Sequence, residues 1–157
     1  MSKLLIFTEG TILIHSESVG HARNEIIQQN LDQIPNIKEY SEYIPIGNAP
    51  AKVAEWQANG YEICYLTSRR KPEEIADIQG VLDRYNFPEA PLYYRQGEET
   101  YGDAATRIMP DIIVDDTCES IGVNEITWTQ LTPDIQNKIK PYIVPEFFGV
   151  DHLPTIL

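Results

Sequence analysis

The sequence predicts an α/β fold of three layers, in which a mostly parallel central sheet carries helices on both faces. Short apolar runs at residues 4–7, 61–66 and 111–114 indicate buried strands, because each is bounded by polar or turn-forming residues. Segments with apolar residues at helical spacing separate these runs. Strands that alternate with helices form parallel sheets through crossovers of one hand, and this rule gives the predicted architecture.

The first strand leads into a Gly-containing turn, and residues 15–46 follow as an insertion before the next helix. Apolar residues at helical spacing predict a helix within residues 21–34, and residues 40–46 are expected to be irregular. This insertion is the predicted position of a small lid. It is far too short for a separate cap domain, so residues 1–157 are expected to form a single domain.

The remaining elements continue the alternation of helix and strand. A helix with Asn48 as its cap and Pro50 in its first turn is expected to end at Asn59-Gly60, directly before the second strand. Another helix is expected to start at Pro72. Further along, we expect a strand at 91–94, a short helix at 103–109, a strand at 111–114, a helical turn from 117 and a fifth strand at 142–144.

Composition restricts the class of protein. A chain of 157 residues suits one domain, and a formal net charge of −12 repels phosphate backbones and anionic membranes. The two cysteines form no disulfide framework, the N-terminal apolar run is too short for a signal peptide, and no stretch reaches transmembrane length. We therefore expect a cytoplasmic protein that binds neither nucleic acid nor membranes.

Three predicted strands end in polar residues that can carry chemistry. These residues are Thr8-Glu9-Gly10-Thr11, Thr67-Ser68-Arg69 and Asp115-Asp116. The carboxyl ends of parallel strands meet at one edge of a sheet, where ligands of open α/β folds bind. We therefore expect the strands at 4–7, 63–66 and 112–114 to be parallel neighbours that bring these residues into one cleft.

The order and spacing of these motifs resemble the haloacid dehalogenase (HAD) phosphohydrolase superfamily over most of the chain, from Lys3 to Asp116. In that family the first strand ends in Asp-x-Asp-Gly-Thr. Its first Asp attacks phosphorus and binds Mg²⁺, and its second Asp is the general acid–base. The resemblance implies a Rossmann-like domain of three layers. Laid on Gly10-Thr11, the second Asp falls on Glu9, and the nucleophile falls on Phe7.

The resemblance also implies roles for the other polar residues. Glu9 takes the acid–base position and joins Asp115 and Asp116 in a weak Mg²⁺ site, since a hard cation prefers oxygen ligands. Thr67 contacts the phosphate and acts in catalysis, with Ser68 as the second choice.

Thr11 and one basic residue complete the implied phosphate site. Arg95 is the chosen basic residue, and Arg107 and Arg69 compete with it. Each arginine taken alone is better explained as a solvated surface charge.

Phe7 departs from the family pattern. A phenyl ring has no lone pair to attack phosphorus and no charge to bind Mg²⁺, and no Asp precedes Asp32. We expect Phe7 to pack in the core beneath the strand tip.

No other side chain clearly replaces the nucleophile. Thr8 lacks a paired base in the sequence and is expected to form turn hydrogen bonds. Cys118 follows two acids at an expected helix start, and the acids oppose a low pKa. The histidines His15, His21 and His152 have no metal-ligand spacing.

Three classes of function remain open. The first is a catalytically degenerate protein that binds a phosphorylated or anionic small molecule. The second is a metal-dependent phosphatase or nucleotidase-like hydrolase that uses Glu9 and water with a metal on Asp115 and Asp116. The third is a regulatory or structural interaction protein that acts through its acidic surface.

Overall fold

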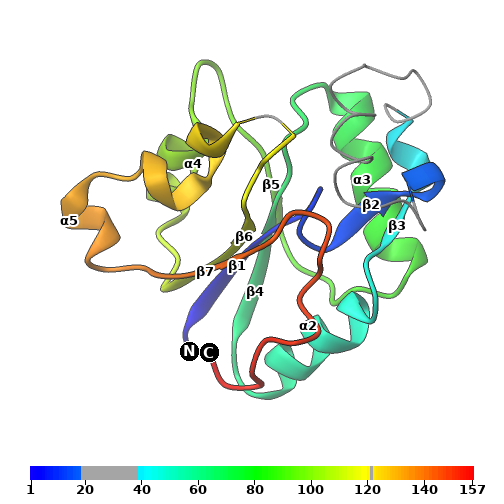
Figure 1. Cartoon of the computed structure of the whole chain (residues 1–157), viewed down its shortest axis with the longest axis horizontal. Coiled ribbons are helices and arrows are strands. Elements are labelled where there is room, and N and C mark those ends of the chain that lie inside the picture. The colour runs from blue at the N-terminus through cyan, green and yellow to red at the C-terminus, as the bar shows by residue number, and fades with distance from the viewer. Residues whose placement is uncertain (19–38, 121) are drawn as a thin grey trace.

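The computed structural model describes residues 1–18, 39–120 and 122–157, and it has the predicted α/β architecture of three layers (Figure 1). A five-stranded sheet in the order β5-β4-β1-β6-β7 forms the centre, and all of its neighbouring strands are parallel. Its strands, in chain order, are β1 (Lys3–Phe7), β4 (Glu62–Leu66), β5 (Leu92–Tyr93), β6 (Ile112–Asp116) and β7 (Lys140–Val144).

The central position of β1 confirms the expected neighbours. In the register of the sheet, Phe7 lies opposite Leu66 of β4, and Ile6 lies opposite Val114 of β6. The chain therefore leaves β1 between the ends of β4 and β6. This arrangement places the residues after all three strands at one edge of the sheet.

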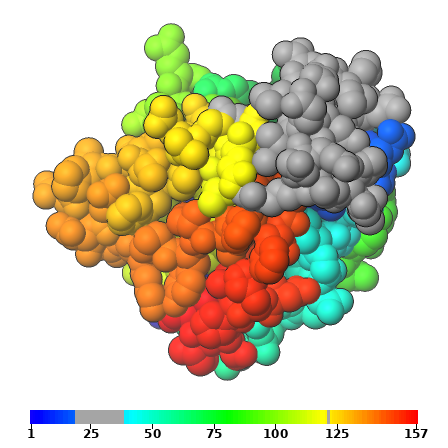
Figure 2. Space-filling model, in the orientation of Figure 1, coloured from blue at the N-terminus to red at the C-terminus, as the bar shows by residue number. Residues whose placement is uncertain are grey.

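Helices cover both faces of the sheet. Leu4 and Ile6 of β1 pack in a cluster with α2 and α3, whereas Leu5 and Phe7 point to the opposite face and pack in a cluster with α4. Two separate apolar cores therefore hold the sheet. The α-helices in the described part of the chain are α2 (Ala49–Ala58), α3 (Pro72–Arg84), α4 (Tyr101–Ile108) and the short α5 (Pro133–Gln136), which lies at one end of the long axis (Figure 2).

Two helix starts differ from expectation. Asn48 makes no side-chain cap to α2; instead its backbone N–H donates to the Asp151 carboxylate at 3.0 Å. Helix α4 begins at Tyr101 instead of residue 103, because Thr100 and Asp103 form a reciprocal capping box. In that box the Asp103 N–H donates to the Thr100 hydroxyl at 3.1 Å, and the Thr100 N–H donates to the Asp103 carboxylate at 3.0 Å.

Two expected irregular or helical stretches are also corrected. The stretch 40–46 contains strand β3 (Tyr43–Pro45), which pairs antiparallel with β2 (Leu13–His15). No helical turn starts at Thr117, because Cys118 takes a left-handed φ of 50° and its N–H donates to the Asp116 carboxylate at 2.7 Å. The fifth strand, β7, begins at Lys140, two residues before the expected start.

The ends of the predicted lid are described, but its middle is not. The β2 and β3 strands form a two-stranded ribbon at its two ends. The helix predicted within residues 21–34 lies outside the described residues. Within the described ranges, no helix has the length and apolar character needed to cross a membrane.

Candidate functional site

Side-chain hydrogen bonds join the tip of β1 to the tips of both neighbouring strands. The Thr67 hydroxyl, after β4, donates to Glu9 Oε1 at 2.5 Å. On the other side, the Thr11 hydroxyl donates to Asp116 Oδ2 at 2.8 Å. The three motifs predicted to share one cleft therefore lie together at the carboxyl edge of the sheet.

Gly10 sets the shape of the turn after β1. Its φ is +84°, a conformation that residues with a Cβ rarely adopt. A Cβ at this position would lie 2.8 Å from Asp116 Oδ2 and 3.3 Å from Glu146 Cγ. The lack of a side chain thus lets the β1 turn approach the acidic residues of β6 and of the segment after β7.

The Glu9 carboxylate accepts hydrogen bonds from the tip of β4 and from the adjoining residue Thr8. Besides the Thr67 bond, Glu9 Oε2 accepts from the Ser68 backbone N–H at 3.1 Å and from the Thr8 hydroxyl at 2.6 Å. The Thr67 hydroxyl is the group that the family resemblance assigns to phosphoryl oxygens. From Ser68, the backbone N–H takes part, whereas its hydroxyl accepts from Arg69. In this structure an oxyanion of the protein itself occupies both donors.

Thr8 differs from expectation in one respect. It forms the expected turn bonds, since its carbonyl accepts from the N–H groups of Thr11, Ile12 and Leu13 at 3.0–3.2 Å. Its hydroxyl, however, has a carboxylate partner in Glu9, whereas the sequence suggested no paired base. The side chain is fully buried, and its hydroxyl also lies 3.3 Å from the Leu66 carbonyl oxygen.

Asp115 and Asp116 are buried carboxylates with neutral partners. Asp115 accepts from the backbone N–H groups of Asp116 at 2.7 Å and Thr127 at 2.9 Å, and Asp116 accepts from Cys118 N–H and from the Thr11 hydroxyl. Desolvation raises the pKa of both groups above the ordinary carboxyl value, and repulsion between the acids raises the pKa of Asp116 further. In the described part of the chain, no basic side chain forms an ion pair with either.

This pair fits a hard divalent cation. Asp115, Asp116 and Cys118 offer ligand atoms that lie within 4.8 Å of one another. Each carboxylate oxygen accepts one internal hydrogen bond and keeps a further lone pair for a metal. The Cys118 thiol is a poorer candidate, because burial raises its pKa and its Sγ contacts the Asp116 carbonyl oxygen at 3.5 Å. Oxygen ligands are those that Mg²⁺ prefers, so Asp115 and Asp116 suit that ion.

Glu146 lies at the candidate site and was not predicted from the sequence. It follows β7, is 5% exposed, and accepts hydrogen bonds from the Ser120 N–H at 2.8 Å and the Ser120 hydroxyl at 2.5 Å. The adjoining Phe147 N–H donates to the Gly10 carbonyl at 2.8 Å and holds this segment against the turn after β1. The rule that polar residues after parallel strands share an edge, applied to the fifth strand, would have found Glu146.

Phe7 packs in the core, as expected. It is 3% exposed, and its ring meets the Tyr101 ring of α4 edge to face at a centroid distance of 5.2 Å. It belongs to the apolar cluster that contains Leu5 and Leu66. The residue that the sequence resemblance aligns with the family nucleophile is therefore a packed aromatic ring.

Of the three basic candidates, Arg95 contacts the candidate site and has no acidic hydrogen-bond partner among the described residues. Its Nη2 donates to the Ser68 carbonyl at 3.0 Å, and its guanidinium lies 4.0 Å from the centroid of the Tyr101 ring. Desolvation lowers the pKa of this guanidinium from its usual value. Its buried Nε has no hydrogen-bond partner within the described ranges.

The other two arginines are engaged by acids. Arg69 bonds to the Tyr40 and Ser68 hydroxyls and lies 3.7 Å from a Glu74 oxygen. Arg107 pairs with Glu99 at 3.1 Å.

The described histidines form other contacts. His15 is buried, accepts from the Glu17 N–H at 3.1 Å and packs edge to face on Tyr43. His152 is exposed and contacts the Phe148 ring. His21 lies outside the described residues.

Solved structures confirm the HAD-like fold. This chain is similar to a class C acid phosphatase from Bacillus anthracis with tungstate bound (14% identity, TM-score 0.54, covering 95% of this chain and 69% of that one). It is also similar to a HAD family hydrolase from Deinococcus radiodurans R1 with bound phosphate and sodium (9% identity, TM-score 0.52, 96% and 85%).

A chain of the Pnkp1/Rnl/Hen1 complex shares the fold as well (12% identity, TM-score 0.54). The match covers 93% of this chain and 47% of that chain, so this protein spans about half of its length. No protein-family model matches the sequence, and no curated protein matches it. At these identities the similarity establishes the fold.

Proposed function

We propose that this protein binds a phosphorylated small molecule at the strand tips, together with a divalent cation, without hydrolysing it through a phospho-aspartate. The observation that carries this proposal is the contrast between Phe7 and the polar residues at the same edge of the sheet. Phe7 is packed against Tyr101, while Thr67, Ser68, Asp115 and Asp116 lie at the tips of the strands on either side of β1.

The contacts of Glu9 support anion binding. The Thr67 hydroxyl and the Ser68 N–H converge on a carboxylate, so they are already oriented toward an oxyanion. A phosphoryl group needs similar donors, and charge-assisted hydrogen bonds to such a group are stronger than neutral ones. Arg95 adds a positive charge beside Ser68. The two solved structures of similar fold hold the oxyanions tungstate and phosphate.

The acidic residues support a role for the cation. Asp115 and Asp116 would hold Mg²⁺, with Thr11 orienting one Asp116 oxygen. When bound, the ion would neutralise the charge shared by the carboxylates and the phosphoryl oxygens. Glu146 adds a negative charge near the same residues. Because the family's first carboxylate is missing, we expect Mg²⁺ to bind more weakly than micromolar.

A second candidate function is hydrolysis by water. The observation that favours it is the Glu9 carboxylate, which lies among the phosphate-type donors and could accept a proton from an attacking water. In this alternative Glu9 is the general base and Asp115 and Asp116 hold the metal. The two candidate functions make opposite predictions for a turnover assay: the first predicts no hydrolysis, and the second predicts hydrolysis.

Calorimetry and a turnover assay test the proposal together. Inorganic phosphate and tungstate are titrated into the protein with and without Mg²⁺, and hydrolysis of an activated aryl phosphate is followed under the same conditions. We expect anion binding that Mg²⁺ strengthens, and no hydrolysis above the buffer rate. Hydrolysis that disappears in Glu9→Gln would establish the second candidate. Absence of anion binding with Mg²⁺ present would overturn the proposed function.

A further inference from the structure

A cleft lies between helix α3 and the edge strand β5, beside the candidate site. Its volume is about 360 Å³, which falls within the range of small-molecule pockets. The residues that line it are Arg70, Pro72, Ile75, Ala76, Gln79, Leu92 and Tyr94. These residues come from the segment after β4, from α3 and from β5 with the residue that follows it.

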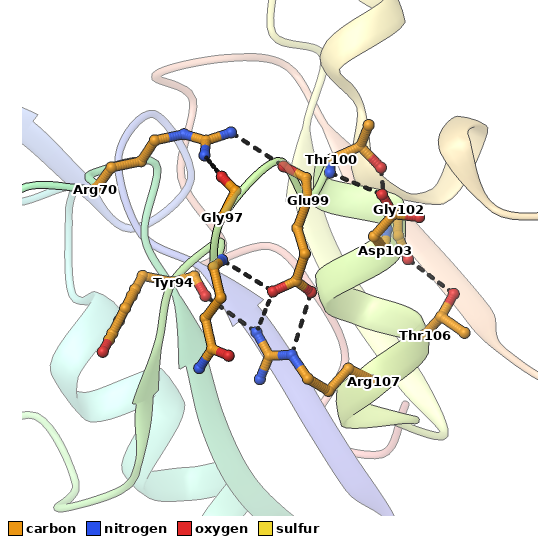
Figure 3. Close-up of polar contacts among 10 residues, drawn as sticks. Arg70, Tyr94, Gly97, Glu99, Thr100, Gly102, Asp103, Thr106 and Arg107 are labelled. Carbon is orange, nitrogen blue, oxygen red and sulfur yellow. Dashed lines mark hydrogen bonds and ion pairs between the residues drawn. The ribbon is translucent and has the colours of Figure 1, made fainter.

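Two arginines hold the loop that forms one side of this cleft. Arg70 donates to the Gly97 carbonyl at 2.5 Å and to the Glu99 carbonyl at 3.0 Å. From the other side, Arg107 donates to the Tyr94 carbonyl at 3.1 Å and pairs with the Glu99 carboxylate (Figure 3). Tyr94 therefore belongs to a loop that Arg70 and Arg107 hold in place by hydrogen bonds and an ion pair. The cleft is thus formed before a ligand binds.

The walls of the cleft favour a flat ring. Tyr94 is 38% exposed and presents an aromatic ring, and the side chains of Pro72, Ile75, Ala76 and Leu92 add apolar surface. Arg70 provides a planar cation that, in the described part of the chain, bonds to carbonyl oxygens and to no acid. Aromatic and guanidinium groups stack on planar rings, so this combination suits an aromatic or heteroaromatic group.

Two short stretches of chain connect the cleft to the candidate site. Ser68, whose N–H contacts Glu9, is two residues from Arg70, a separation of at most about 7 Å between Cα atoms. Tyr94, which lines the cleft, precedes Arg95, which donates to the Ser68 carbonyl. A ligand with its phosphate at Thr67 and Ser68 can thus reach the cleft through a short linker.

We propose that this cleft binds the ring of the ligand, so that the preferred ligands are phosphorylated molecules with an aromatic or heteroaromatic ring on a short linker, a class that includes mononucleotides. This inference rests on the proposed function for the phosphate position. The two-residue length of β5 gives little edge for a peptide strand to pair with, which favours a small molecule over a peptide.

Phosphonates that cannot be hydrolysed test this inference. Phenylalkyl phosphonates of increasing linker length, propylphosphonate and inorganic phosphate are titrated by calorimetry in the presence of Mg²⁺. At the best linker length, we expect the phenyl compound to bind about tenfold more tightly than propylphosphonate. Ala76→Trp fills the cleft from an exposed position and should remove this difference, whereas Ala51→Trp, on the exposed side of α2, should retain it.

Variants of Tyr94 separate the ring from the hydroxyl. Tyr94→Phe should keep the preference for the phenyl compound, and Tyr94→Ala should reduce it by about fivefold or more. Inorganic phosphate should bind all of these variants equally. If the phenyl compound does not bind, or binds Ala76→Trp as tightly as Ala51→Trp, the cleft assignment is overturned, whatever inorganic phosphate does. If the phenyl compound binds in the cleft but inorganic phosphate does not bind, the cleft assignment stands and the proposed function is overturned.

Discussion

The Thr67 hydroxyl lies 2.5 Å from Glu9 Oε1, and this hydrogen bond ties the tip of β4 to the tip of β1. The Ser68 N–H donates to the other oxygen of the same carboxylate. Glu9 therefore occupies the Thr67 and Ser68 donors that a phosphoryl group would need. An anion that binds to these donors must displace the Glu9 carboxylate. The charge of Glu9 opposes anion binding in the same position, so neutralising that charge should expose the affinity of the donors.

Glu9→Gln should tighten the binding of inorganic phosphate by about tenfold, because it removes the negative charge that competes with the anion for the Thr67 and Ser68 donors. Calorimetry with Mg²⁺ present measures the change. Glu62→Gln is the matched control, since Glu62 is exposed at the start of β4, on the opposite edge of the sheet. Equal phosphate affinity in wild type and Glu9→Gln would show that the anion does not bind at Thr67 and Ser68.

The buried acids predict how stability depends on pH. Burial, with repulsion from Asp115 and Glu146, raises the pKa of Asp116 from 3.8 to about 8. The folded chain then binds more protons than the unfolded chain between these values, so the free energy of unfolding falls as pH rises from about 4 to about 8. In metal-free buffer, we expect wild type to lose at least about 1 kcal/mol of stability across this interval.

Urea unfolding of Asp116→Asn measures the contribution of this group. The variant should lose less stability than wild type between about pH 5 and about pH 8, because the titrating carboxyl is gone. Asp134→Asn, at an exposed position of α5, should behave like wild type. Added Mg²⁺ should restore part of the free energy of unfolding that wild type loses at the higher pH. A wild type whose stability is flat or rises across the interval in metal-free buffer would contradict the assigned direction.

The strands could be predicted because their signal is local. Residues 4–7, 63–66 and 112–114 are apolar on both faces of the sheet, so each appears in the sequence as a short apolar run between polar or turn-forming residues. Strand β3 gave no such signal. Its conformation depends on pairing with β2, where Tyr43 lies opposite His15, and neither residue marks a strand by itself.

The site could be predicted in part for a similar reason. Glu9, Thr67 and Asp115 lie at or just after the ends of recognisable strands, and the parallel order brings them to one edge. Glu146 follows a strand with a weaker signal, and a tertiary bond from Phe147 to Gly10 brings it to the site. The pairing of the Thr8 hydroxyl with Glu9 depends on the conformation of a tight turn, which residue types alone do not specify.

Gly10 and Gly60 give a matched pair for testing the turn after β1. Both have positive φ, +84° and +93°, so alanine strains the backbone at either position. Alanine at residue 60 meets nothing within 4 Å, whereas at residue 10 its Cβ falls 2.8 Å from Asp116 Oδ2. We expect Gly60→Ala to cost about 1 kcal/mol and Gly10→Ala to cost clearly more.

Only Gly10→Ala should also weaken Mg²⁺ binding, since it displaces the carboxylate of Asp116, one of the two proposed metal ligands. Thermal melting with and without Mg²⁺ measures both effects. If the two variants melt alike and respond alike to Mg²⁺, the close approach of the turn to Asp116 does not matter to the metal site.

The last prediction concerns Phe7→Asp, which restores a carboxylate at the position of the family nucleophile. The wild-type Phe7 is 3% exposed and its ring packs on Tyr101. Truncation of this side chain should lower the free energy of unfolding by about 3–5 kcal/mol, and the buried charge of the new Asp should lower it further.

Phe7→Leu, which keeps an apolar side chain, controls for the loss of the ring. Melting temperature with and without Mg²⁺, followed by turnover of an activated aryl phosphate, gives the two readings. We expect Phe7→Asp to melt well below Phe7→Leu without metal and to regain more stability than Phe7→Leu when Mg²⁺ is added, because the ion pairs the new charge with Asp115 and Asp116. A folded Phe7→Asp that gains nothing from Mg²⁺ would show that residue 7 does not reach the metal pair, and that the alignment of its position with the family nucleophile is wrong.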